Sequence, residues 1–493
     1  MTAPDRPAGA AELKGTAVTV AGLGVSGVPA AKALHRLGAH VTVVNTTAGD
    51  KQRAEAAGLE ALGIAVRLGD DAGSPARLPD GTELVVTSPG WRPDTPMFAE
   101  AAGRGIEIWG DVELAWRLRG PGAAPWLAVT GTNGKTTTTR MLAAILGAAG
   151  LRTAAVGNIG VSLLDAVLGE QDPTGESGGY DVLAVELSSY QLHWAPSIRP
   201  HSAAVLNLAP DHLDWHGSMA AYTADKGRIY QGNQVACVYN TADPATERLV
   251  READVAEGCR AIGFTLGAPR VSELGLVDGL LVDRAFVPDR QGTAQELAGT
   301  ADVQPPAPHN IANALAAAAL ARAWGVPPSA VREGLRAFRP DAHRIAEVAV
   351  LDGVTWVDDS KATNTHAAEA SLAAYDSVVW LAGGLAKGAE FDELAARAAD
   401  RLRGAVLFGA DRALIREALA RHAPQVPVVE LERTDTGAMS AAVAAARELA
   451  RTGDTVLLAP ACASMDMFAN YNQRGDLFAA AVRALAGPAD QTR

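Results

Sequence analysis

The sequence feature that most restricts the fold of this chain is the stretch AVTGTNGKTTTTR at residues 128–140. It joins an apolar, strand-like run to a helix-like run through a glycine-containing loop. Backbone N–H groups in such a loop point at phosphate oxygens, with Lys135 reaching the β- and γ-phosphates and the Thr136 hydroxyl reaching Mg²⁺. Val129 stands where the strict P-loop has glycine. The stretch therefore predicts a shortened relative of that loop, in an α/β protein that binds a nucleoside triphosphate.

A second glycine-rich loop lies in VTVAGLGVSGVPAAKALHRLGAHVTVV, residues 18–44. Gly22, Gly24 and Gly27 form the pattern G-x-G-x-x-G, which lets a backbone approach a diphosphate at a helix N-terminus. An NAD site also needs an acidic residue about 20 residues further on, where this chain has Asn45. The loop predicts a Rossmann-like unit and leaves its nucleotide open.

Alternating strand-like and helix-like segments predict three α/β units. Gly/Pro-containing stretches at residues 117–125 and 338–344 separate them, so we predict domains at residues 1–120, 121–339 and 340–493. Residues 171–180 and 265–305 resemble insertions, and we predict that the second is β-rich or a loop.

Charge and cysteine content restrict the partners and the compartment. The 493-residue chain has a net charge of −13, which argues against a nucleic-acid partner. Its three cysteines have no metal-ligand spacing and fit a reducing, cytoplasmic setting. The first residues lack the apolar core of a signal peptide, and the alanine-rich run at 311–325 is too short to span a membrane. We expect a cytoplasmic protein with no membrane partner, in which that run forms a buried helix.

Metal-binding side chains follow the next two apolar strands. Glu186 ends the strand-like run DVLAVEL, and NLAPDHLDWHGS then supplies Asp211, His212, Asp214 and His216. The spacing of His212 and His216 allows zinc. Hard oxygen ligands beside a phosphate loop, without cysteine, favour Mg²⁺.

Three polar clusters follow strands in the last unit: DDSKATN at 358–364, GGLAKG at 383–388 and APACAS at 459–464. Each alone reads equally well as an ordinary turn. Because ligands bind at the carboxyl edge of open α/β sheets, all three together predict a site there.

Six stretches resemble the Mur ligase family, in order over nearly the whole chain: GTNGKTTTT, ELSSYQL, DHLDWHGSMAAYTADKGRIY, HNIANALAA, DDSKATN and APACASMDMFANYNQRGDLF. GLGVSG, DSKATN and PACASMDMF resemble the D-glutamate-adding branch, and no DNPR-like stretch of its diaminopimelate- or lysine-adding sister is present. The resemblance implies three domains: a Rossmann-like N-terminal one, a P-loop ATPase-like central one with a mostly parallel sheet, and a Rossmann-like C-terminal one.

The resemblance also implies the activity. A member of this branch joins D-glutamate to UDP-N-acetylmuramoyl-L-alanine in peptidoglycan precursor synthesis. It uses ATP and Mg²⁺, passes through an acyl phosphate, and releases ADP and phosphate. The first glycine loop then holds the nucleotide sugar rather than NAD, and we expect a monomer. The alternatives are a sister or folylpolyglutamate-type ligase, a nucleotide-gated switch protein that binds a UDP-sugar, and an NAD-dependent oxidoreductase.

The resemblance further implies residue roles. The ATP site comprises Gly131, Thr132, Asn133, Gly134, Lys135, Thr136, Thr137, Asn310, Asn313, Arg344 and Asp359. The UDP-substrate site comprises Gly24, Val25, Ser26, Asn45, Thr46, Asn158 and His212. The D-glutamate site comprises Lys361, Thr363, Lys387, Ser464 and Tyr471. The metal ligands are Thr136, Glu186, His212 and Lys226 as a carbamate, and the catalytic residues are Lys135, His212, Lys226 and Arg344.

Without the resemblance, several of these residues have plainer interpretations. Lys226 reads as a solvated helical lysine. Asn310 and Asn313 read as capping or packing residues of an alanine-rich helix. Ser464 and its neighbour Cys462 read as turn residues, since no base stands beside the cysteine.

Overall fold

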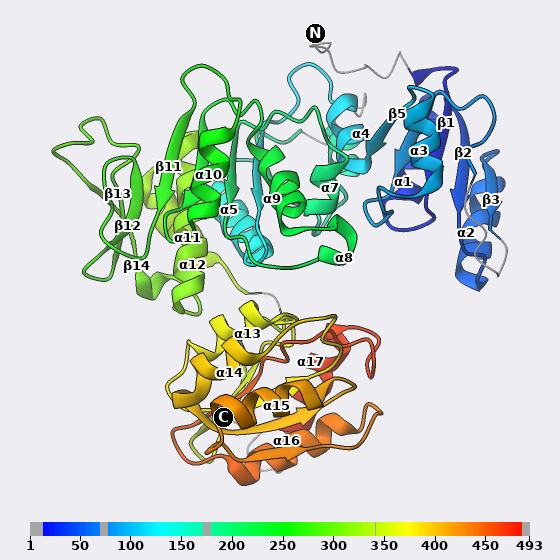
Figure 1. Cartoon of the computed structure of the whole chain (residues 1–493). Coiled ribbons are helices and arrows are strands. Elements are labelled where there is room, and N and C mark those ends of the chain that lie inside the picture. Colours follow the sequence, from blue (N-terminus) through cyan, green and yellow to red (C-terminus); the bar gives the residue numbers. More distant parts are fainter. Residues whose placement is uncertain (1–12, 70–76, 171–178, 341, 486–493) are drawn as a thin grey trace. The chain divides into compact units, whose positions relative to one another are not determined.

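A computed structural model of the chain describes residues 13–69, 77–170, 179–340 and 342–485. Most of the predicted insertion at 171–180 therefore lies outside the described residues. The chain forms two compact units, one of Met1–Val303 with Asn310–Phe338 and one of Gln304–His309 with Arg339–Arg493. The first unit contains two β-sheets and the second contains one (Figure 1).

The first sheet has five parallel strands in the order β3-β2-β1-β4-β5. The strands are β1 (Ala17–Ala21), β2 (His40–Asn45), β3 (Ala65–Leu68), β4 (Leu84–Thr87) and β5 (Glu107–Gly110). The helices are α1 (Gly27–Arg36), α2 (Asp50–Glu60), α3 (Pro96–Gly103) and α4 (Asp111–Leu118). From β1 the chain continues to β2 and β3 on one side of the sheet and then crosses to β4 and β5 on the other side. The strand order therefore reverses at β1, beside the first glycine loop.

The second sheet has nine strands in the order β14-β13-β12-β11-β10-β9-β6-β8-β7. Its parallel strands are β6 (Trp126–Thr130), β7 (Ala155–Gly157), β8 (Leu183–Glu186), β9 (Ser202–Val205), β10 (Ala236–Asn240), β11 (Arg260–Phe264) and β12 (Glu273–Val277). Strand β6 is buried along its whole length, as its continuous apolar sequence requires in a sheet covered on both faces.

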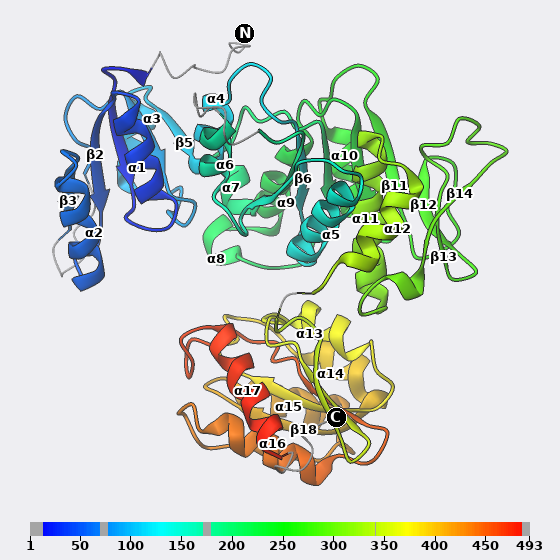
Figure 2. The ribbon, with the colours of Figure 1, turned by 180° about the vertical axis from the view of Figure 1, so that it is seen from behind.

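Helices cover both faces of this sheet. Figure 1 shows α7 (Ser189–His193), α9 (Met219–Gly227) and α10 (Pro244–Glu252) on one face. From behind, Figure 2 shows α5 (Lys135–Ala148) and α12 (Pro328–Ala337) on the other. The remaining helices are α6 (Leu163–Glu170), α8 (Leu213–His216) and α11 (Pro308–Trp324). The alanine-rich run lies in α11, where residues 314–321 are all buried, so the predicted buried helix is confirmed.

Residues 265–305 continue the central sheet rather than form a separate body. β12 pairs with β13 (Leu280–Asp283), and β13 pairs with β14 (Gln295–Gly299), both antiparallel. Asp278 and Gly279 join β12 to β13 with φ of 48° and 76°. Two positive φ angles are those of the tight hairpin turn that Asp-Gly favours. The β-rich form of this prediction is therefore confirmed.

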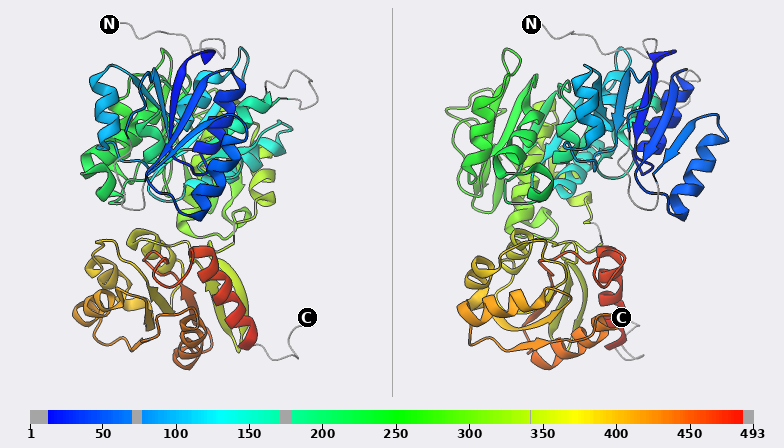
Figure 3. Two further views of the ribbon diagram at one scale, coloured as in Figure 1. Left: turned by 90° about the vertical axis from the view of Figure 1, so that its right-hand side faces the viewer. Right: turned by 45° about the vertical axis from the view of Figure 1, so that its right-hand side comes forward.

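The third sheet forms the second unit, in the order β15-β16-β20-β17-β18-β19. Its strands are β15 (Ala346–Leu351), β16 (Val354–Asp358), β17 (Val378–Gly383), β18 (Leu402–Phe408), β19 (Val428–Glu430) and β20 (Thr455–Leu458). Only β15 runs antiparallel to its neighbour. Helices α16 (Ala438–Leu449) and α17 (Tyr471–Leu485) pack together on one face (orange and red in Figure 3). Helices α13 (Thr365–Leu372), α14 (Asp392–Ala398) and α15 (Arg412–His422) share the other apolar core.

The three mostly parallel sheets confirm the predicted fold class. The domain boundaries at residues 120 and 339 stay predictions. No helix among the described residues is long and apolar enough to cross a membrane.

Candidate active site

The phosphate loop lies between β6 and α5, as predicted. Gly134 caps α5 in the left-handed conformation, with φ of 83°. A Cβ atom there would collide with the side-chain oxygen of Asn313 on α11. Only glycine relieves both the positive φ and the close approach, so the loop packs directly against α11. Asn310 and Asn313 are both buried at this contact, and the Asn313 amide donates to Asn310 Oδ1 over 3.5 Å.

Side chains from the loop after β9 and from helix α9 hydrogen-bond to the phosphate loop. The backbone N–H of Asn133 donates to Asn207 Oδ1 over 2.8 Å, and Asn207 Nδ2 donates back to the Asn133 carbonyl over 3.1 Å. Thr132 Oγ1 is 2.9 Å from the hydroxyl oxygen of Tyr222 on α9. The loop is therefore ordered by protein contacts, which lowers the cost of organising it around a phosphate.

Two lysines meet at one carbonyl of this loop. Lys135 Nζ donates to the carbonyl oxygens of Gly131 and Thr132 over 3.0 and 2.9 Å. Lys226 Nζ donates to the same Gly131 oxygen over 2.9 Å and lies 3.4 Å from Thr130 Oγ1. Lys226 is only 2% exposed, so its interpretation as a solvated helical lysine is wrong. The pKa of Lys226 is lowered well below its usual value, mainly by burial and further by the charge of Lys135.

Glu186 provides a buried carboxylate at the edge of the loop. It ends β8, where it pairs in register with Val129 of β6, and is 1% exposed. Its Oε1 accepts a hydrogen bond from Asn158 Nδ2 over 2.8 Å. Its Oε2 is buried without a hydrogen-bond partner among the described residues. Since an unsatisfied buried oxygen is costly, the carboxylate fits a bound cation such as Mg²⁺.

His212 opens α8 in a left-handed conformation, with φ of 54°. Its side chain is 44% exposed, and its ring centroid lies 4.9 Å from that of Tyr190. Partial burial lowers the pKa of His212, and the charges of Lys135 and Lys226 lower it further. These shifts favour the neutral imidazole, the form that binds a metal.

His216 is committed to protein contacts on both ring nitrogens. Its Nδ1 lies 3.0 Å from Asp225 Oδ2 and its Nε2 lies 2.9 Å from Ser189 Oγ. The zinc pair of His212 and His216 is therefore not formed. The described residues contain no group of three or more His, Cys, Asp or Glu side chains arranged to hold a metal.

Asp225 joins three elements around this histidine. Its carboxylate also lies 2.9 Å from His193 Nδ1 and 3.2 Å from Arg228 Nε. Since Asp225 directly precedes Lys226, these contacts fix α9 and the buried lysine against α7 and α8. No local sequence pattern indicates this role, because the partners are separated along the chain.

We expect Asp225→Asn to lower the free energy of unfolding by about 2 kcal/mol, since the single oxygen of an amide cannot accept hydrogen bonds from His193, His216 and Arg228 together. Urea unfolding measures the loss. Asp214→Asn is the matched control, because Asp214 is an exposed carboxylate of the same segment. Equal stability of the two variants would contradict this role of Asp225.

The first glycine loop is shaped by close contacts at two of its glycines. A Cβ at Gly22 or Gly27 would meet Ser88 Oγ or the Gly22 carbonyl, whereas Gly24 has open space around it. Val25 is 91% exposed. Gly24 and Val25 are thus at an open surface, where a ligand can reach the backbone.

The polar residues of this loop are partly committed to the protein. Ser26 Oγ donates to Asp111 Oδ2 over 2.8 Å. Asn45 Oδ1 accepts from the Leu23 N–H over 3.3 Å, and its amide donates to Thr47. Thr46 is half-buried beside it. Asn45 therefore supports the loop, a role that its place at the strand end did not reveal.

Backbone hydrogen bonds join the three clusters of the second unit. The Ala461 N–H donates to the Ala362 carbonyl over 2.9 Å, and Leu385 and Ala463 exchange two bonds of 2.9 Å. The clusters at 358–364, 383–388 and 459–464 thus lie at one sheet edge, as predicted. Lys361 Nζ lies 4.0 Å from the centre of the Tyr471 ring.

The other predicted residues of this edge differ in exposure. Ser464 is buried, Thr363 is half-buried, and Lys387 is exposed with φ of 50°. Asp359 is buried, accepts hydrogen bonds from Ser371 Oγ and the Ile345 N–H, and has its pKa raised by burial to about 6. Its predicted closure with Arg344 onto the nucleotide stays a prediction.

Arg474 supports this edge and was missed in the sequence. It is completely buried, and its guanidinium donates to the Ser360 hydroxyl, the Ser360 carbonyl and the Cys462 carbonyl over 3.0, 2.8 and 3.1 Å. These bonds tie α17 to two of the ligand loops. Its place in the quoted stretch APACASMDMFANYNQRGDLF was the only signal.

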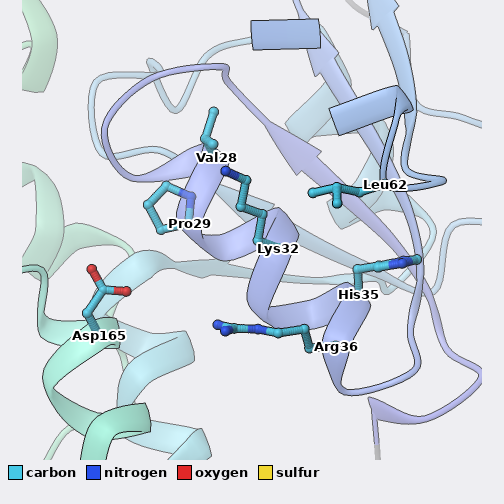
Figure 4. Close-up of a pocket in the computed structure, with 7 residues that line it drawn as sticks. All are labelled: Val28, Pro29, Lys32, His35, Arg36, Leu62 and Asp165. Carbon is cyan, nitrogen blue, oxygen red and sulfur yellow. The ribbon is translucent and has the colours of Figure 1, made fainter. Parts of the chain in front are cut away.

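A pocket of about 380 Å³ lies apart from these residues, between α1 and Asp165 of α6 (Figure 4). It is lined by Val28, Pro29, Lys32, His35, Arg36, Leu62 and Asp165. None of the predicted site residues lines it, so its size alone does not identify the active site.

Comparisons with known sequences place the chain in a family. It matches the Mur ligase middle domain over residues 129–321 and the Mur ligase glutamate ligase domain over residues 343–462. The UDP-N-acetylmuramoylalanine–D-glutamate ligase of Streptomyces avermitilis is 77% identical over 472 residues, 96% of this chain and 99% of that protein. The protein of the same name from Streptomyces coelicolor is 75% identical, over 96% of this chain and 99% of its own length.

Solved structures share the fold at low sequence identity. The MurF ligase of Thermotoga maritima, in complex with ADP, has a TM-score of 0.56 and 16% identity, covering 90% of this chain and 95% of that chain. The UDP-N-acetylmuramate-alanine ligase of the same organism has a TM-score of 0.54 and 18% identity, covering 95% and 99%. Because the relatives match it over nearly its full length, the chain belongs to the Mur ligase family.

Proposed function

We propose that this protein joins D-glutamate to UDP-N-acetylmuramoyl-L-alanine with the hydrolysis of ATP to ADP and phosphate, in peptidoglycan precursor synthesis. The names of the relatives that are 77% and 75% identical support this substrate pair. The observation that carries the proposal is the phosphate loop with Lys135, Lys226 and the unpaired Glu186 oxygen around it. Such a site holds and polarises a triphosphate.

The reaction has two steps. The alanyl carboxylate attacks the γ-phosphorus of ATP, ADP leaves, and an acyl phosphate forms. The D-glutamate amine then attacks the acyl carbon, the tetrahedral intermediate collapses, and phosphate leaves with the amide in place. Lys135 and the N–H groups of the loop hold the phosphates and neutralise their charge, so positioning and electrostatics supply the catalysis. His212 either accepts the proton of the amine or only binds metal.

Mg²⁺ would be held by Thr136, Glu186, His212 and the carbamate of Lys226, and would neutralise charge on the transferred phosphate. The surroundings of Lys226 support the proposed carbamate. Only a neutral amine attacks CO₂, and burial beside Lys135 favours that form. The product is an anion beside the Lys135 ammonium, and it would provide hard oxygen ligands.

The substrates would use the edges of the other two sheets. At the first sheet, Gly24, Val25, Ser26, Asn45 and Thr46 would hold the nucleotide sugar, which Asn158 and His212 would reach from the central sheet. At the third sheet, Lys361, Thr363, Lys387, Ser464 and Tyr471 would hold D-glutamate. Asn310, Asn313, Arg344 and Asp359 would complete the ATP site.

We also propose the three domains at residues 1–120, 121–339 and 340–493, a monomer, and a cytoplasmic location.

A panel of amino acids tests the proposal. Purified protein is incubated with UDP-N-acetylmuramoyl-L-alanine, ATP, Mg²⁺ and one amino acid, and the amide product is measured by mass spectrometry. D-Glutamate alone is expected to give product and to stimulate phosphate release. Product with another amino acid would indicate a sister or folylpolyglutamate-type ligase. Hydrolysis without an amide would indicate a switch protein, and NADH binding seen by fluorescence would favour an oxidoreductase.

We expect Arg344→Ala to lower turnover roughly 10- to 100-fold, because a charge-assisted contact to phosphate contributes about 1.5–3 kcal/mol. The rate of phosphate release at saturating ATP measures the effect. Arg433→Ala is the control, since Arg433 is an exposed arginine of the same unit paired with Asp435. Wild-type turnover in the Arg344 variant would exclude it from the reaction.

A further inference from the structure

Two cysteines face each other in the central sheet, outside every proposed site. Cys237 lies in β10 and is 2% exposed, and Cys259 is a half-buried residue directly before β11. Their Sγ atoms are 3.9 Å apart. Because β10 and β11 are neighbours, this contact is built into the sheet register, in which Cys237 pairs with Ala261.

The two thiols differ in solvent exposure and in pKa, and both differences favour attack by Cys259 in a thiol–disulfide exchange. Cys259 follows an exposed turn at Glu257 and Gly258, which leaves its sulfur partly accessible to a small reagent. Cys237 is enclosed by the apolar core. The hydrogen bond between the thiols lowers the pKa of Cys259 and raises that of Cys237, so the accessible thiol is also the one that ionises more readily.

We propose that Cys237 and Cys259 close reversibly to an intrachain disulfide by exchange with a small-molecule disulfide, with Cys259 attacking first and Cys237 resolving. The Cys259 thiolate attacks one sulfur of the reagent, the reagent's S–S bond breaks, and one small thiolate leaves and takes up a proton. Cys237 then loses its proton and attacks Cys259 Sγ, which expels the second small thiol. Two protein thiols and one small disulfide thus become one protein disulfide and two small thiols.

The sheet separates this pair from the proposed phosphate site. The phosphate loop follows the carboxyl end of β6, whereas Cys237 lies near the amino end of β10, two strands away in the same parallel sheet. Closing the bond therefore leaves the loop intact. It joins residues 237 and 259 across α10, which restricts the unfolded chain and stabilises the unit.

Oxidised glutathione is the probe for the test, applied to the full-length native protein at mildly alkaline pH. Free thiols are counted after denaturation, and linked peptides are found by mass spectrometry. The wild type is expected to fall from three free thiols to one, to lose the mass of two hydrogen atoms, and to link Cys237 to Cys259. Its melting temperature should rise by several degrees, and its ATPase rate should stay within about twofold.

The third cysteine supplies the matched control. Cys462→Ser removes the buried thiol of the other unit and should fall from two free thiols to none, with the same rise in melting temperature. Cys259→Ser should form no link and show no rise. Three thiols remaining in the oxidised wild type, a link to Cys462, or a stable mixed disulfide on Cys259 beside a free Cys237 would each overturn the proposal.

Discussion

Lys135→Ala is expected to reduce turnover at least ~10²-fold, as the loss of a preorganised charge stabiliser does. The Lys135 ammonium lies inside the phosphate loop, within 3.0 Å of two of its carbonyl oxygens. Binding of UDP-N-acetylmuramoyl-L-alanine should remain nearly unchanged, because the first glycine loop belongs to a different sheet. Steady-state kinetics and calorimetry with the nucleotide sugar measure the two effects.

Arg140→Ala provides the control, since Arg140 is an exposed cation on the same helix α5. It should keep wild-type turnover and binding. If Lys135→Ala instead abolishes binding of the nucleotide sugar and leaves the ATPase rate intact, the assignment of the two glycine loops to two nucleotides is reversed.

Lys226→Ala is expected to remove most activity, because the proposed carbamate is a metal ligand at the phosphate loop. Small carboxylic acids such as acetate should partly restore turnover, since a carboxylate fills the space that the side chain leaves and carries the same charge. Direct detection uses ¹³C-bicarbonate and NMR on active enzyme. One carbamate signal is expected in the wild type and none in the variant.

Lys51→Ala is the matched control, because Lys51 is an exposed lysine of α2. Its loss should leave the carbamate signal and the turnover unchanged. Circular dichroism verifies that the Lys226 variant is folded. Fully active wild-type enzyme without a labelled carbamate would exclude the modification and leave Lys226 as a hydrogen-bond donor to the Gly131 carbonyl.

Apolar runs bounded by turn residues predicted most strands of the parallel sheets. Strands β6 and β17 are examples, because both faces are covered and every residue is buried. Strands β3 and β15 lie at sheet edges and contain no buried residue, so no continuous apolar run marks them in the sequence. Asp-Gly pairs at 278–279 and 352–353, all with positive φ, are the local sequence signal of the two antiparallel hairpins, β12 with β13 and β15 with β16.

Some residues of the candidate site can be predicted from local sequence, and others cannot. Thr130 to Thr137, with the strand before and the helix after, follow from local sequence, because a phosphate loop is built from consecutive residues. Asn207, Asp225 and Arg474 were missed, because each acts through partners distant along the chain. No local pattern records such a contact.

The alternation of strands and helices, the two glycine loops and the resemblance to the family can all be read along the chain. The burial and the partners of the side chains depend on how the segments pack. Lys226 looks like a solvated lysine along the chain, and packing of α9 against the phosphate loop buries it beside Lys135. Asn313 becomes part of that loop only because α11 reaches Gly134. Burial and charge pairing depend on distances between segments far apart in sequence, and only the packed sheets set those distances.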